Sequence, residues 1–151
     1  MGIEENKKTL QRYFDELLND QDFSKSDEIL HEEYSGSAAE GLKGVEGLKQ
    51  YRDYMHSLSS DLHWETLEMI AEGDKISIFS QLSGTHEGEF QGIPATYKPF
   101  TRVISGIYEF KDGKVHRGLT RVASDMLTVL QQWGVLPSLA EIAKAYNDSL
   151  K

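Results

Sequence analysis

The 151-residue sequence contains no cysteine, only three prolines and no apolar run approaching the ~18 residues of a membrane-spanning helix. The missing cysteines exclude disulfides, thiolate metal sites and a cysteine nucleophile. Basic side chains are also few, since 16 of them stand against 25 acidic ones for a net charge of −9. Nucleic acids and anionic membranes select clustered Lys and Arg, so neither is an expected partner. We expect a cytoplasmic protein.

Metal and cofactor motifs are absent as well. No two of the five histidines have a spacing such as H-x-x-x-H, and no helix pattern contains H-E-x-x-H. The sequence also lacks a P-loop, a G-x-G-x-x-G turn before a helix and a G-x-S-x-G elbow. We therefore expect no metal and no cofactor.

Aromatic residues are plentiful, with two Trp, seven Tyr and six Phe. Aromatic side chains commonly build the walls of apolar ligand pockets. The length fits one domain over residues 1–151, with no linker, repeat or low-complexity tract to divide it. The composition thus favours a globular domain with a small-molecule pocket.

The hydrophobic period changes along the chain from helical to strand-like and back. Helical spacing covers residues 10–18 and 45–58, with a short turn holding Ile29 and Leu30 between them. Strand patterns follow at 62–71, 75–84, 100–110 and 115–122, and helical spacing returns at 126–133 and after the capping box at 138–141. Asp112-Gly113 is typical of a two-residue hairpin turn. The predicted class is α+β with one four-stranded antiparallel sheet.

The strand predicted at 100–110 carries apolar residues on both faces. Phe100, Ile104 and Tyr108 share one face, while Val103 and Ile107 share the other. We expect a strongly curved sheet with helices in its concavity and a covered back. An apolar outer face of this kind predicts a homodimer formed through it.

Three stretches of the chain, in this order, resemble the SnoaL-like polyketide cyclases of the nuclear-transport-factor-like, cystatin-type cone superfamily. They are AEGDK (71–75), SGTHEGEFQGIP (83–94), which is close to the family's GTH-x-G-x-x-x-G-I-P hairpin, and FKDGKV (110–115) followed by Asp125 and LQQWGVLP (130–137). The resemblance covers residues 5–137 and leaves an additional C-terminal helix at 138–151. It implies a cone fold that encloses one apolar cavity.

The resemblance makes Asp125 the main catalytic candidate, because the matching aspartate is the family's general acid/base. Such a carboxylate works best in an apolar pocket that raises its pKa. The alternative is structural, because Ser124-Asp125 directly precedes a helix and Asp is a common N-cap. The chain also departs from the family in having Arg121 where Trp is common and Ser37 where His or Asn is common.

Further residues are candidates for the site. His63 begins a predicted strand and is a candidate acid/base partner, with a half-exposed sheet position as the alternative. Candidate substrate-binding residues, each with plain core packing as the alternative, are Tyr13, Tyr51, Met55, Trp64, Arg102, Tyr108 and Arg121. Arg102 is expected to pair with Asp125 or Glu109.

The resemblance implies a cofactor-independent cyclase, or related lyase or isomerase, that acts on a hydrophobic carbonyl-containing small molecule by aldol-type ring closure. A non-catalytic small-molecule-binding or accessory protein on the same fold is the alternative from another class. A dehydratase or epoxide hydrolase is a third, and it requires a second ionisable group close to Asp125.

Overall fold

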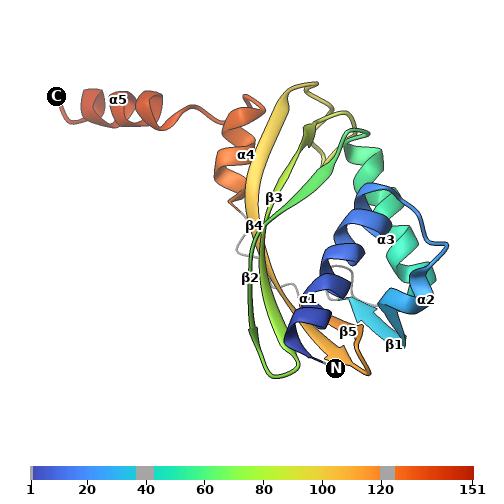
Figure 1. Ribbon diagram of the computed structural model, residues 1–151. Helices are drawn as coiled ribbons and strands as arrows, with labels where there is room; N and C mark the ends of the chain where they lie inside the picture. The colour runs from blue at the N-terminus through green and yellow to red at the C-terminus, as the bar shows by residue number, and fades with distance from the viewer. Residues whose placement is uncertain (1, 37–42, 120–124) are drawn as a thin grey trace.

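The computed structural model describes residues 2–36, 43–119 and 125–151 of the chain. The elements follow in the order α1 (Ile3–Arg12), the π-helical η1 (Tyr13–Asn19), α2 (Ser26–Ile29), β1 (Leu30–Gly36), α3 (Gly44–Leu58), β2 (His63–Glu72), β3 (Lys75–Thr85), β4 (Pro99–Lys111), β5 (Lys114–Leu119), α4 (Met126–Gln132) and α5 (Leu139–Ser149). One sheet has the strand order β1-β5-β4-β3-β2, and α1, α2 and α3 lie on its concave side (Figure 1). The α+β class with a curved sheet is confirmed.

The N-terminal helical segment forms one side of the core. The predicted apolar stripe becomes its buried face, made of Leu10, Tyr13, Phe14, Leu17 and Leu18. The segment changes from α- to π-helical at Tyr13, and the helix is continuous there because Arg12 keeps helical backbone angles. Burial of this stripe against the sheet supplies most of the helix's stability, because helices this short are marginal on their own.

The four predicted strands form with boundaries shifted by only one or two residues at the described ends. The Asp112-Gly113 turn has φ values of 52° and 73°, as a type I′ hairpin requires. The pairing register shifts between Thr66 and Glu68 on β2 and between Glu109 and Phe110 on β4. Such irregularities bend and twist strands, which accounts for the curl of the sheet.

The strand β1 corrects the predicted topology. The sequence pattern indicated only a short turn near Ile29 and Leu30, whereas Leu30–Gly36 forms a fifth strand that pairs in parallel with β5. The sheet is therefore mixed rather than purely antiparallel. The buried Leu30 and Tyr34 face the core, while the intervening Glu32 and Glu33 are exposed.

The outer face of the sheet is uncovered within one chain. Val103 is 50% exposed and Ile107 is 44% exposed, so the expected covering of this face is not supplied by the chain's own described elements. Their strand neighbours Arg102 and Tyr108 point to the opposite, concave side, where they line a cavity.

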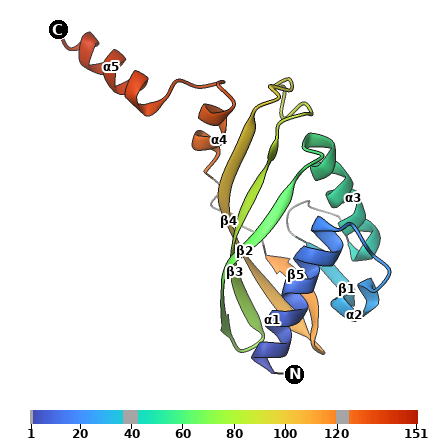
Figure 2. The same ribbon diagram turned by 45° about the horizontal axis from the view of Figure 1, so that its top comes forward.

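The two C-terminal helices differ in their packing. Helix α4 packs its buried Val129 against the sheet, and Gly134 ends the helix with a φ of 73°. Helix α5 begins at the predicted capping box of Ser138 and Glu141 and has no buried residue. It projects away from the sheet in both views (Figures 1 and 2). Among the described residues, no helix has the length and apolar character needed to cross a membrane.

The β3–β4 loop is docked on the end of α3 by close backbone contact. The N–H groups of Glu87 and Gly88 both donate to the carbonyl oxygen of Leu58, at 2.9 and 3.1 Å. A Cβ at Gly88 would overlap the carbonyl oxygen of Ser57. Because backbone rather than a flexible side chain fills this space, only glycine fits without displacement.

We expect Gly88→Ala to lower the free energy of unfolding by about 1–3 kcal/mol through this overpacking. Urea denaturation measures the change. The matched control is Glu89→Ala in the same loop, whose exposed side chain predicts a change within about 0.5 kcal/mol. Equal stabilities of the two variants would contradict the docked arrangement.

Candidate active site

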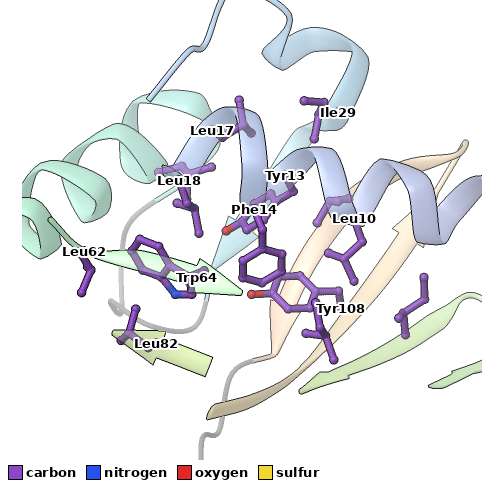
Figure 3. Packing of buried hydrophobic residues seen from close by; sticks show 14 of the residues in the cluster. Leu10, Tyr13, Phe14, Leu17, Leu18, Ile29, Leu62, Trp64, Leu82 and Tyr108 are labelled. Carbon is purple, nitrogen blue, oxygen red and sulfur yellow. The ribbon is translucent and has the colours of Figure 1, made fainter. Parts of the chain in front are cut away.

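A cavity of about 470 Å³ lies between the concave face of the sheet and the helices α1–η1 and α3. Its walls are mainly aromatic and aliphatic, and none of the described residues that line it is a carboxylate. Tyr13, Phe14 and Tyr108 lie together between the helix and the sheet at one end (Figure 3). The volume is within the range of small-molecule sites.

Most of the predicted substrate-binding residues meet at this cavity. Those that line it are Tyr13, Tyr51, Met55, Trp64, Arg102 and Tyr108. They come from η1, α3, β2 and β4, which the sheet and helix packing bring together. Arg121 and Ser37 lie outside the described residues.

Tyrosine hydroxyls form a buried polar group within the apolar wall. The Tyr13 and Tyr34 hydroxyls are hydrogen-bonded at 2.9 Å, and the Tyr13 ring packs edge-on against Tyr108 at 5.5 Å. Burial raises the pKa of Tyr34 to about 12 and raises the pKa of Tyr13 well above its usual range. Both phenols are therefore neutral at physiological pH and able to donate hydrogen bonds. Sequence reasoning missed Tyr34 because it missed β1, whose alternation turns Tyr34 inward.

Arg102 places a cation at the cavity wall. Burial lowers the pKa of its guanidinium, and the nearby Tyr51 phenol opposes that shift. Arg102 Nη1 lies 3.1 Å from the sulfur of Met126, the first residue of α4. The expected partner Glu109 instead contacts Lys75 at 3.6 Å and Arg117 at 3.5 Å. The predicted Arg102–Glu109 pair is thus replaced by two contacts of Glu109 with other cations.

Asp125 occupies the N-cap of α4. Its carboxylate accepts hydrogen bonds from the backbone N–H of Thr128 at 3.0 Å and from the Thr128 hydroxyl at 2.5 Å. Both bonds lower the pKa of the Asp125 carboxyl, and the bond from the Thr128 hydroxyl has the larger effect. The side chain is exposed and does not line the cavity. In this arrangement Asp125 acts as a helix N-cap, which is the structural alternative to a catalytic role.

His63 lies away from the cavity. It is exposed at the start of β2, and the next residue, Trp64, is buried and lines the cavity. Successive strand residues point to opposite faces, so His63 faces outward. Its role as an acid/base partner stays a prediction to which this geometry adds no support.

His86 has a structural environment. Its buried ring stacks on Trp133 with centroids 3.7 Å apart, and its Nδ1 accepts from the backbone N–H of Thr96 at 3.3 Å. Burial lowers the pKa of the imidazole. A second hollow of about 60 Å³ lies beside this pair and shares Arg102 and Phe90 with the main cavity. His86 thus helps to fix the loop after β3.

Three potential metal ligands from β1 and β5 lie close together, although the spacing of the histidines in the sequence did not indicate a metal site. Ligand atoms of His31, Glu33 and His116 lie within 4.8 Å of one another because β1 and β5 pair in parallel. These atoms already have protein partners, since Lys111 donates to Glu33 at 2.7 Å and the Glu33 N–H donates to His31 Nδ1 at 3.1 Å. A metal bound through His31 Nδ1 or Glu33 Oε2 would compete with these interactions.

The raised tyrosine pKa values predict that stability falls with alkaline pH. Above pH 10 the unfolded chain releases a Tyr34 proton that the folded chain keeps up to about pH 12. Each such proton makes the free energy of unfolding fall by about 1.4 kcal/mol per pH unit in this window. Urea denaturation between pH 9 and 12 should show a shallower fall for Tyr34→Phe, and an unchanged fall for the exposed Tyr146→Phe. Parallel curves for Tyr34→Phe and the unsubstituted chain would contradict this assignment.

Solved structures share this fold over most of the chain. TsrD from Streptomyces laurentii superposes with a TM-score of 0.76 at 24% identity, covering 90% of this chain and 99% of that one. AclR from Streptomyces galilaeus superposes with a TM-score of 0.75 at 20% identity, covering 99% of this chain and 93% of that one. A SnoaL-like polyketide cyclase from Agrobacterium tumefaciens superposes with a TM-score of 0.72 at 16% identity, covering 84% of this chain and 96% of that one. At these identities the likeness establishes the fold alone.

A comparison with curated proteins gave no match. The family comparison is direct, because residues 8–133 match the family described as SnoaL-like polyketide cyclase. This span includes the helix, the sheet and the cavity walls described above, and it ends at Trp133, before α5. The chain belongs to the SnoaL-like polyketide cyclase family.

Proposed function

We propose that the protein binds a hydrophobic, carbonyl-containing small molecule in the 470 Å³ cavity and promotes its aldol-type ring closure without a cofactor. The observation that carries this proposal is an aromatic cavity with the Arg102 guanidinium and neutral tyrosine hydroxyls at its wall. A cyclase-type role agrees with the family to which the chain belongs.

The cavity offers hydrogen-bond donors to the oxygens of such a ligand. Arg102 is the permanent charge. The buried Tyr13 and Tyr34 phenols are neutral, and because one donates its proton to the other, the pair has one O–H left for a ligand. The Ser80 hydroxyl also lines the cavity, is 1% exposed and has no partner within the described part of the chain. A buried hydroxyl without a partner is costly, so a polar ligand group at this place is favourable.

Ring closure requires a proton to leave the carbon beside a carbonyl. The resulting enolate carbon forms a bond to a second carbonyl carbon, whose oxygen then takes a proton. Arg102 is suited to stabilise the negative oxygen, and Asp125 is our candidate for the proton acceptor. Asp125 adjoins Met126, which contacts Arg102. The proton-transfer role requires the carboxylate to leave Thr128 and turn toward the bound ligand.

A second candidate function is non-catalytic binding on the same fold. It is favoured by one observation, the exposed Asp125 carboxylate whose pKa is lowered by Thr128. A dehydratase or epoxide hydrolase gains no such support, because both described partners of this carboxylate are atoms of Thr128 rather than a second ionisable group. We also propose a homodimer through the uncovered outer face of the sheet and, because cysteine is absent, a cytoplasmic location.

Two substitutions at Asp125 separate catalysis from capping. Asn is as good an N-cap as Asp, so Asp125→Asn should keep stability within about 0.5 kcal/mol, whereas Asp125→Ala should lose about 1 kcal/mol. The probe is 2-acetonaphthone, whose α-hydrogen exchange in D₂O is followed by NMR. We expect Asp125→Asn to bind this ketone normally and to slow protein-dependent exchange by about 10²–10⁴-fold.

Each other outcome of that experiment is informative. Exchange at the unsubstituted rate in Asp125→Asn would show that another group takes the proton. Binding of the ketone by the unsubstituted protein without any exchange would favour the non-catalytic alternative. No binding of the ketone at all would contradict the assignment of the cavity itself.

Arg102 is predicted to bind the carbonyl oxygen. Replacing Arg102 by Met keeps the bulk of the side chain and should weaken binding of 2-acetonaphthone about 10- to 100-fold, because hydrogen bonds to charged groups contribute about 1.5–3 kcal/mol. Isothermal titration measures the Kd. The control ligand 2-ethylnaphthalene lacks the oxygen and should bind both forms alike. The control variant Arg117→Met, exposed on β5, should leave both affinities unchanged. Equal losses for the two ligands would show that Arg102 acts only by packing.

A further inference from the structure

Helix α5 is specified by the sequence but buries no residue against the described part of its own chain. Its capping box is complete, with the Ser138 N–H donating to Glu141 at 2.8 Å and the Glu141 N–H donating to Ser138 at 3.2 Å. None of its residues is buried. An isolated helix of eleven residues is marginal in water, so a helix with such defined ends requires a packing partner.

The helix carries an apolar face that is open to solvent. Leu139, Ile142, Tyr146 and Leu150 follow the i, i+3, i+7, i+11 spacing of one helix face and are 43–67% exposed. The charged residues Glu141, Lys144 and Asp148 lie on its other side. This arrangement is typical of a helix that docks its apolar face on another surface.

The outer face of the sheet offers a matching surface. Ile70, Phe79, Val103 and Ile107 are all exposed there, on three adjacent strands. Phe79 pairs with Ser105, so Val103 and Ile107 flank it diagonally across the ladder. Helix α5 projects from the side of the sheet opposite α1, α2 and α3 (Figures 1 and 2). A second copy stacked on the outer face would lie on that same side.

The link between α4 and α5 holds α5, which we call the arm, away from the sheet of its own chain. The N–H groups of Val135 and Leu136 donate to the Leu130 carbonyl at 2.9 and 3.3 Å. The Gln131 side chain donates to the Pro137 carbonyl at 2.9 Å. These bonds fix the link on α4 up to the residue before the cap, so the direction of α5 is set by the fold.

Charge also favours a second copy as the partner. Residues 138–151 contain Glu141, Asp148, Lys144 and Lys151 and are neutral, whereas the whole chain carries −9. All of the excess negative charge therefore lies in residues 1–137. A neutral arm approaches an acidic copy of the chain without the like-charge repulsion that the bodies themselves experience.

We infer that α5 is an exchanged arm, which packs its apolar face on the outer sheet face of a second copy and receives that copy's arm on its own sheet. This inference rests on the proposed homodimer and adds a specific contact to it. In a two-fold dimer the exchange is reciprocal, so two arms and two sheet faces are buried together. Stable dimers bury roughly 1,600 Å² in total, and the reciprocal exchange would contribute two such contacts to that area.

The first test is sedimentation equilibrium of full-length variants. Ile142→Lys places a charge on the apolar face of the arm and should weaken the dimer at least tenfold. Ala145→Lys adds the same charge to the exposed polar side of the same helix and should leave the dimer Kd unchanged. A dimer that Ile142→Lys does not weaken, but that Val103→Lys does, would overturn the exchange and leave the sheet-face dimer standing. A monomeric unsubstituted chain would overturn both.

The second test uses the absence of native cysteine. Chains carrying Ile142→Cys and Val103→Cys are mixed and oxidised, and a disulfide-linked heterodimer is expected. The matched pair of Ala145→Cys and Val103→Cys should not cross-link. A chain carrying both Ile142→Cys and Val103→Cys that closes on itself as a monomer would overturn the exchange. Binding of 2-acetonaphthone in the cavity is measured separately, and failure there would not affect the arm.

Discussion

The contact that Tyr13 makes between the N-terminal helix and the sheet underlies both the fold and the cavity. Its hydroxyl is hydrogen-bonded to Tyr34 on β1, and its ring packs on Tyr108 of β4. One buried side chain therefore connects a helix to two strands that are not neighbours in the sheet. The same residue lines the cavity. Because the walls are set by this packing, the cavity is available without folding around a ligand, which lowers the entropic cost of binding.

Features with local causes could be predicted from the sequence. The apolar stripe at 10–18, the hairpin at Asp112-Gly113 and the capping box at Ser138 each depend on residues a few positions apart, and each forms as predicted. The strand β1 depends on pairing with β5, about 80 residues later, and no local pattern shows that partner. For the same reason sequence spacing could not bring His31 and His116 together.

The site was predictable to the extent that strand alternation and helical period determine direction. Arg102 and Tyr108 are an even number of residues apart on β4, and both line the cavity. His63 and Trp64 are adjacent on β2, so their side chains point to opposite faces of the sheet. The more apolar tryptophan is the one buried on the cavity side. The function of Asp125 depends instead on a side-chain torsion at a helix end. Sequence places the residue there but does not choose between the cap and the cavity.

Electrostatics shows what that choice requires. Although the chain carries −9, no carboxylate is among the described residues lining the cavity, and its permanent charge is the cation of Arg102. The cavity is thus suited to stabilise a negative oxygen, and the proposed ring closure would need a proton acceptor from outside these lining residues. Opening the Asp125–Thr128 cap costs about 1 kcal/mol. In the proposed mechanism the ligand must favour the inward carboxylate by more than this cost, which is small beside the roughly 8 kcal/mol of a micromolar affinity. If Asp125 is the base, ligand binding and the arrival of the base in the cavity are coupled, and a ligand too small to reach α4 would occupy the cavity without reacting.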